Sequence, residues 1–413
     1  MSAQEPSRGD WAELGFEHLS SIPLVSEFVF RSPRYRDNES TEKSTEKEVV
    51  DHLFLCDGKC LLISQKVQDD PTKRTQERNQ QWVLKNIQRS LRPITGAIRN
   101  PPKGPIWCNH PRLGRVEFDV LPPVVHGVVL AETWRPVKLS PIAASLPSEI
   151  QGIPISYFSI NDFMNILVRL RTIPEVIEYL SARRALAKEC LNSVGDEMAL
   201  FGLYLMQGGS LEGGKGNAEA KQRIRCNRDS FQKAIERNNE QIRFSSVLEH
   251  AADCLATRDP NWFDGITEEM RSLFDPDIKR RNYVLLQEPL TRLRLRERAE
   301  LGRCFYSVMQ RTAEKRAGIS FAAGHIDGNE LLFLFISARG ESRKNLFGAM
   351  QALTRAALAH YKMGRCWVIS DRDGTNFEVA LTVLDYSPTP EDIAEGKRLF
   401  GPLKTLDVDV SGL

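Results

Sequence analysis

The chain has 413 residues, of which 41% are hydrophobic and 27% are charged, and its formal net charge at pH 7 is +2. This composition is typical of a soluble globular protein, and the length favours two domains. Because the net charge is small, any affinity for nucleic acid must come from local clusters of basic residues.

The sequence predicts a cytoplasmic protein. No apolar run approaches the roughly 18 to 20 residues that a membrane-spanning helix needs, so no membrane partner is expected. The N-terminal sequence Met-Ser-Ala-Gln-Glu-Pro lacks the basic and apolar regions of a signal peptide. The 8 cysteines are scattered, as expected of reduced thiols.

The N-terminal elements are short. Residues 1–9 are predicted to be disordered, and an amphipathic helix is expected over 10–20. A strand is expected over 24–30. The polar and charge-rich stretch 32–47 predicts a solvated loop.

The most informative segment, residues 51–66, predicts a β-hairpin. Asp57-Gly58 supplies the two-residue turn, because a type I′ turn needs positive φ at both central positions. The two strands carry apolar residues on both faces, which is typical of strands inside an α/β sheet. We therefore predict an α/β fold whose sheet contains this hairpin.

The turn also fixes the register of the hairpin. When Cys56 pairs with Lys59, counting along the two strands places Asp51 opposite Ser64. Lys66, two residues further on, points to the same face as Ser64, since side chains alternate along a strand. The open end of the hairpin is therefore expected to gather an acidic, a polar and a basic side chain.

This arrangement resembles the PD-(D/E)XK nuclease superfamily, in which one strand of a hairpin carries a metal-binding Asp and the next carries Glu or Asp, any residue, and Lys. Asp51 matches the first element and Lys66 the last. Ser64 stands where the second carboxylate is expected, and Gln65 follows it. The resemblance covers roughly residues 10–190, whose flanking pattern is similar to that of uncharacterised bacterial members of this group.

The resemblance implies hydrolysis of a phosphodiester with Mg²⁺ or Mn²⁺, because a bound cation stabilises the anionic transition state and activates water. Asp51 would be a metal ligand, and the backbone carbonyl of Gln65 would be a second ligand. Lys66 would act electrostatically on the attacking water or on the transition state.

Ser64 is neutral, which removes one formal charge from this site. Three replacements for the carboxylate stay open. An amide oxygen of Gln65 or Gln68 is one, and the upstream acidic helpers Glu13 and Glu17, one helical turn apart, are another. The third is a downstream carboxylate, and the candidates are Asp69, Asp70 and Glu77.

A long basic helix is predicted over residues 72–100, with Trp82, Ile87 and further apolar residues facing the sheet. Its remaining surface is basic, and charge neutralisation of phosphates dominates the affinity of nucleic-acid binding. Nucleic acid, in particular DNA, is therefore the expected partner. The residues expected to contact it are Lys73, Arg74, Arg78, Lys85 and Arg89, on a helix that also carries Arg92 and Arg99.

Further strands are predicted over 116–121, 126–131 and 153–158, and a helix is expected to begin at Ser159 with Asp162 completing a capping box. These segments complete the first domain. A zinc site is a weaker prediction, because two of its four potential ligands point to opposite faces of the hairpin. Those ligands are Cys56, Cys60, Cys108 and His110.

The predicted fold class is α/β, with a restriction-endonuclease-like mixed sheet flanked by helices over residues 10–205. A glycine-rich linker is expected over 206–224, and residues 225–413 predict a helical and α+β accessory domain. An arginine-rich helix over 290–316 is a second candidate for binding nucleic acid or a partner. Its arginines are Arg292, Arg294, Arg296, Arg298 and Arg303.

Two functions follow from the resemblance. The first is a metal-dependent endonuclease, which in this superfamily often serves restriction or defence. The second is a catalytically inactive nuclease-like module that binds nucleic acid or a protein partner. A homodimer is also left open, because many nucleases of this fold pair two subunits. A structural alternative remains, in which Asp51 caps the strand and Lys66 is a solvated end residue.

Overall fold

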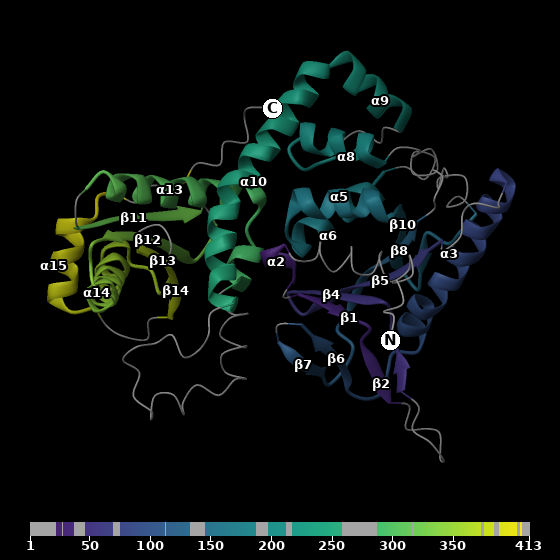
Figure 1. The fold of residues 1–413 in the computed structure, drawn as a ribbon, viewed down its shortest axis with the longest axis horizontal. Helices are drawn as coiled ribbons and strands as arrows, with labels where there is room; N and C mark the ends of the chain where they lie inside the picture. The colour runs from purple at the N-terminus through teal and green to yellow at the C-terminus, as the bar shows by residue number, and fades with distance from the viewer. Residues whose placement is uncertain are drawn as a thin grey trace, which may run out of the picture. The chain divides into compact units, whose positions relative to one another are not determined.

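The computed structural model describes residues 22–26, 28–36, 46–68, 75–111, 113–132, 145–186, 197–211, 217–257, 287–315, 318–326, 328–372, 376–383, 388–402 and 405–406. The chain divides into two compact units, Met1–Asn238 and Asn239–Gly412. Each unit combines helices with a mixed sheet, which confirms the α/β class (Figure 1).

The described strands of the first unit form two sheets. The larger is a mixed sheet of six strands in the order β1 (Val29–Arg31), β4 (His52–Cys56), β5 (Lys59–Val67), β8 (Val124–Glu132), β10 (Ile153–Ser159) and β9 (Glu149–Ile150). The smaller is antiparallel, in the order β3 (Glu46–Glu48), β2 (Arg34–Arg36), β6 (Ile106–His110) and β7 (Gly114–Phe118).

The described helices of the first unit are α2 (Pro23–Ser26), α3 (Gln76–Arg99), α5 (Ile160–Leu170), α6 (Ile173–Arg184), α8 (Glu197–Met206) and α9 (Asn217–Cys226). The long helix α10 (Arg228–Thr257) begins in this unit and continues into the second. The predicted cap of α5 is confirmed, since the Ser159 hydroxyl accepts a hydrogen bond from the Asp162 amide at 3.0 Å.

The β4–β5 hairpin has the predicted turn and register. Asp57 and Gly58 have φ angles of 47° and 68°, as a type I′ turn requires. Cys56 pairs with Lys59, and the pairing continues without a slip to His52 opposite Ile63. Because β4 and β5 lie between β1 and β8, both edges of the hairpin are paired with neighbouring strands.

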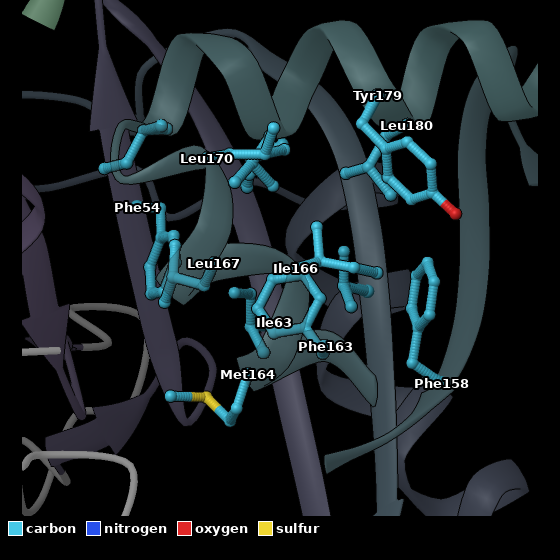
Figure 2. Packing of buried hydrophobic residues seen from close by; sticks show 14 of the residues in the cluster. Phe54, Ile63, Phe158, Phe163, Met164, Ile166, Leu167, Leu170, Tyr179 and Leu180 are labelled. Atoms are coloured by element: carbon cyan, nitrogen blue, oxygen red, sulfur yellow. The ribbon is translucent and has the colours of Figure 1, made fainter. Parts of the chain in front are cut away.

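Alternating side chains of the hairpin enter two different cores. On one face, Phe54 and Ile63 are fully buried with residues of α5 and α6, as Figure 2 shows. On the other face, Leu62 is equally buried and pairs with Gly127 of β8. A Cβ atom at Gly127 would lie 3.0 Å from the side chain of Ile94, so α3 covers this second face. The sheet is therefore the middle of three layers.

Three predicted segments differ in the structure. The strand expected over 24–30 is instead the short helix α2 followed by β1. The loop expected over 32–47 contains the strands β2 and β3, which pair with each other. The second part of the linker expected over 206–224 is helical, because α9 starts at Asn217.

The second unit is also built in three layers. Its described strands form a sheet in the order β14 (Asn376–Val383), β13 (Arg365–Arg372), β12 (Leu331–Arg339), β11 (Gly318–Ile326) and β15 (Thr405–Leu406). Phe305 stacks on Phe335 on one face, and Leu346 packs with Leu334 on the other. The helices on these faces are α13 (Leu295–Ala313) on the first and α14 (Arg343–Tyr361) with α15 (Pro390–Leu399) on the second.

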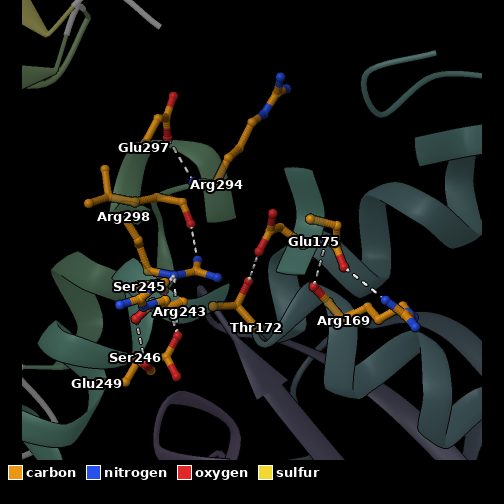
Figure 3. Close-up of polar contacts among 12 residues, drawn as sticks. Arg169, Thr172, Glu175, Arg243, Ser245, Ser246, Glu249, Arg294, Glu297 and Arg298 are labelled. Atoms are coloured by element: carbon orange, nitrogen blue, oxygen red, sulfur yellow. Dashed lines mark hydrogen bonds and ion pairs between the residues drawn. The ribbon is translucent and has the colours of Figure 1, made fainter. Parts of the chain in front are cut away.

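Helix α13 carries a fully buried arginine rather than a free basic surface at one of the predicted contact positions. Arg298 Nε donates a hydrogen bond to the Ser245 hydroxyl at 3.1 Å and lies 3.9 Å from a carboxylate oxygen of Glu249 (Figure 3). The prediction that Arg298 contacts nucleic acid is therefore wrong.

None of the described helices combines the length and apolar character that crossing a membrane requires.

Close packing of α13 against α10 gives a first testable prediction. A Cβ atom at Gly302 would overlap the backbone carbonyl of Phe244, whereas one at the exposed Gly348 of α14 would meet nothing within 4 Å. We expect Gly302→Ala to lower the free energy of unfolding by about 1–3 kcal/mol through overpacking. The control Gly348→Ala should raise it by about 0.5–1 kcal/mol, because alanine favours a helix. Urea unfolding measures both, and equal effects of the two variants would contradict the packing.

Candidate functional site

Asp51 joins three segments of the first unit through hydrogen bonds. Its carboxylate oxygen Oδ2 accepts a bond from the Ser64 hydroxyl at 2.6 Å and another from the Gln65 amide at 2.7 Å. Its backbone carbonyl accepts a bond from the Ser32 amide at 2.8 Å. The expected position of Asp51 opposite Ser64 is therefore confirmed, and the carboxylate ties the start of β4 to β5.

Lys66 lies on the face of β5 that α3 covers. It is half-buried and follows the alternation of Ser64 and Gln68, and the Gln68 amide donates to Asn79 of α3 at 3.0 Å. Within the described part of the chain, Lys66 forms no ion pair with Asp51. The side chains predicted to lie together at the open end of the hairpin are therefore arranged differently. The Asp51 carboxylate is bound by a hydroxyl and a backbone amide, and not by the Lys66 ammonium group.

The Gln65 side chain lies on the opposite face. It is buried and follows the alternation of Ile63, whose partner across the hairpin is His52. Burial lowers the pKa of His52 to about 4, although the nearby Asp51 carboxylate opposes the shift. The side-chain amide of Gln65 points away from Ser64 and Lys66. It therefore cannot replace the missing carboxylate on their face.

The described residues do not fit a Mg²⁺ site. Magnesium prefers hard oxygen ligands, usually one or two carboxylates with waters and a substrate phosphate. Asp51 is the carboxylate of this site, and Oδ2 is already used by two hydrogen bonds. In the ranges that the structure describes, no three His, Cys, Asp or Glu side chains gather as ligands.

The other predicted carboxylates do not change this conclusion. Glu13 and Glu17 lie outside the described residues, as do Asp69 and Asp70. Glu77 is described and exposed in the first turn of α3. The predicted metal-binding roles of Asp51 and Gln65 consequently stay predictions.

Two of the side chains in the zinc prediction are engaged elsewhere. The Leu113 amide donates to His110 Nδ1 at 3.0 Å, so the other ring nitrogen carries the proton and donates to the Ser26 carbonyl at 2.8 Å. The Cys60 thiol donates to the Pro122 carbonyl at 3.2 Å. A metal on His110 would have to break one of the two bonds of its ring.

Helix α3 carries the predicted basic surface. Lys73 and Arg74 lie outside the described residues, whereas the other basic residues of this region are exposed. Their spacings of seven, four, three and seven residues place them on one stripe of the helix, opposite the side that faces the sheet. The five residues of this α3 stripe are Arg78, Lys85, Arg89, Arg92 and Arg99.

The α3 stripe is strongly unbalanced in charge. Glu77 is the one acidic residue of α3, against five basic ones. Among the described residues, no carboxylate forms an ion pair with any member of the stripe. The side toward the sheet differs slightly from the prediction, because Val83 and Ile87 are buried and Trp82 is only half-buried.

A second basic surface was missed by the sequence analysis. On the small sheet, the guanidinium groups of Arg36 and Arg115 lie 5.7 and 5.2 Å from the ring centroid of Trp107. Arg34 pairs directly with Trp107 across β2 and β6. The alternation of Arg34 and Arg36 about one tyrosine is the sequence signal that could have revealed a strand with a basic face.

Comparison of the chain with protein-family models, with curated proteins and with solved structures finds no match.

The hydrogen bonds of Asp51 give a second prediction. Asp51→Ala leaves the buried Ser64 hydroxyl and the Gln65 amide without their shared acceptor, and each such loss costs about 1–3 kcal/mol. We expect this variant to lose about 2–4 kcal/mol of unfolding free energy, and Ser64→Ala about 1 kcal/mol. Urea unfolding measures both. An Asp51→Ala protein as stable as wild type would show that the carboxylate has no structural role.

His126 gives a prediction for pH. It is buried in β8 and its Nε2 lies 2.9 Å from the Ser156 hydroxyl. Burial, reinforced by the charges of Arg183 and Arg184, lowers its pKa to about 3. The unfolded chain, with a pKa near 6.5, binds the proton more readily, so stability falls as pH drops below about 6.5.

At pH 4.5 this group should remove about 2–3 kcal/mol of the stability present at pH 7. His126→Gln should shrink the difference in stability between the two pH values by that amount. Urea titrations at both pH values test this. An unchanged difference in His126→Gln would refute the assignment.

Proposed function

We propose that this chain binds nucleic acid along the α3 stripe and that its hairpin is a nuclease-like element without a complete metal site. The observation that carries the proposal is the set of five exposed cations on one side of α3, which no described carboxylate neutralises. Solvated helix faces ordinarily mix both signs of charge, and this one does not.

The dimensions of the stripe support a phosphate backbone as its ligand. From Arg78 to Arg99 the stripe extends about 32 Å at 1.5 Å per residue. Lys85, Arg89 and Arg92 follow one another at about 4.5–6 Å along the axis, close enough for each to reach a different phosphate. Backbone contacts of this kind give affinity without sequence specificity, so the proposal names no preferred sequence.

The surrounding fold supports a restriction-endonuclease-like module. A hairpin with a carboxylate at its open end lies within a mixed sheet, and helices cover both faces of that sheet. In the superfamily that the sequence resembles, a cation binds the two carboxylates at this point. Here the Ser64 hydroxyl and the Gln65 amide bind Asp51 directly, so the local structure needs no cation.

Metal-dependent hydrolysis remains a prediction of the sequence resemblance. The observation in its favour is that Asp51 is bonded to Ser64 and that Lys66 shares the face of Ser64 on β5. A homodimer and a protein partner stay predictions as well. The same purified protein tests binding and cleavage separately.

Binding is tested by removing three charges from the stripe. We expect the triple variant Lys85→Gln, Arg89→Gln, Arg92→Gln to bind a fluorescein-labelled 20-base-pair duplex more weakly. Its plot of log K against log salt should be shallower by about 2–3 units, since each phosphate contact contributes about 0.9. Fluorescence anisotropy at several salt concentrations gives both quantities.

The matched control removes the same number of exposed cations from α10, as Arg228→Gln, Lys233→Gln, Arg237→Gln. The control should retain the wild-type slope. Equal losses in the two triple variants would reduce the effect to net charge and contradict the stripe as the binding surface. If the wild type cleaves the duplex with Mg²⁺ or Mn²⁺ and Lys66→Ala does not, the result would instead support the nuclease function.

A further inference from the structure

A cavity of about 440 Å³ opens on the small sheet of the first unit. Arg31, Arg34 and Arg115 line it together with the carboxylate Glu46 and the indole of Trp107. This volume lies in the range of small-molecule sites, and its cationic lining favours an anionic ligand.

Strand pairing explains why these side chains share one face. Trp107 in β6 pairs with Arg34 of β2 and with Glu117 of β7, and directly paired residues point to the same side of a sheet. Arg36 and Arg115 lie two positions along from those partners, so they belong to the same face. Trp107 is thus flanked by an arginine from each neighbouring strand.

The half-buried indole and the two guanidinium groups over it supply flat surfaces on which a base can stack. The guanidinium groups of Arg36 and Arg115 lie within 6 Å of its ring centroid, the range of cation–π contacts, which restrict how the ring turns. Nucleic-acid bases stack on aromatic rings and on guanidinium planes alike. An acidic peptide would pair with the arginines but would not stack on the indole or on the guanidinium planes beside it.

The carboxylate in the cavity holds the position that a phosphate would take. Glu46 lies 3.5 Å from Arg34 and 3.8 Å from Arg36. These three side chains are 42–61% exposed, and exposed ion pairs contribute little to stability. A phosphate can therefore displace Glu46 and make charge-assisted hydrogen bonds to both arginines.

We infer that this cavity binds one unpaired nucleotide of a single strand, with its base on Trp107 and its phosphate on Arg34 and Arg36. The inference rests on the proposed function and narrows its ligand to nucleic acid with a single-stranded segment, because a base stacked inside a duplex cannot reach the indole. The cavity adjoins the hairpin, since its residue Ser32 donates to the Asp51 carbonyl at 2.8 Å.

The test compares two labelled oligonucleotides of equal length and charge, ten thymidines and ten abasic residues, by fluorescence anisotropy with the full chain. The wild type should prefer the thymidine strand by about tenfold, the usual effect of stacking one base. Trp107→Ala should remove that preference, and Trp107→Phe should keep part of it. Arg34→Gln should weaken binding of both strands.

Glu46→Gln supplies a test with the opposite sign. Removing the competing carboxylate should tighten binding of both strands severalfold, whereas a merely structural Glu46 predicts no gain. Circular dichroism shows whether Trp107→Ala folds. If it does not fold, Glu46→Gln and the comparison of thymidine with abasic strands still test whether the cavity binds a nucleotide.

Two results would overturn the inference and leave the proposed function standing. One is equal affinity of the wild type for the thymidine and abasic strands while duplex binding still depends on the α3 stripe. The other is competition by a poly-glutamate peptide as effective as that of the thymidine strand, which would indicate an acidic protein partner. If the wild type bound neither the single strands nor the duplex, both proposals would be refuted.

Discussion

One carboxylate oxygen, Oδ2 of Asp51, fixes the end of the central hairpin. Its two acceptor bonds join the residue before β4 to Ser64 and Gln65 of β5, while the Asp51 carbonyl receives the Ser32 amide from the connection between β1 and β2. Asp51 is therefore one point at which the large sheet is joined to the segment that leads into the small sheet, and Phe30 of β1 also packs on His110 and Phe118 of the small sheet. Because β4 and β5 are interior strands, the packing of α3 on one face and of α5 and α6 on the other depends on the register that this residue completes.

The same bonds change what the hairpin can do chemically. A site that holds two carboxylates close together needs a cation to offset their repulsion, whereas a serine hydroxyl and a backbone amide stabilise one carboxylate without it. Ser64 thus lacks the negative charge that would help to bind a metal. Its hydroxyl donates a hydrogen bond to the Asp51 carboxylate instead. The basic residues of α3 lie on the side of that helix away from the sheet, so binding of a phosphate backbone there does not require chemistry at the hairpin.

The sequence predicted those elements whose cause is local. The turn at Asp57-Gly58, the register that follows from it, and the cap at Ser159 each depend on residues a few positions apart, and all are confirmed. Strands β2 and β3 were predicted as loop because each has three residues, and the partner β6 lies about 70 residues away in the chain. The burial of Arg298 was missed for a similar reason, since its partner Ser245 is 53 residues distant. Likewise, only pairing of β2, β6 and β7 brings Arg36, Trp107 and Arg115 together.

We propose that Asp51 acts as a hydrogen-bond acceptor within the fold and not as a metal ligand. Calorimetric titration of Mn²⁺ into the full chain, with the thymidine strand present, tests it most directly when wild type is compared with Asp51→Asn. We expect the two proteins to take up Mn²⁺ alike, with no site that depends on the Asp51 charge. A stoichiometric Mn²⁺ site in the wild type that Asp51→Asn abolishes would contradict it and restore the hairpin as a metal-dependent active site.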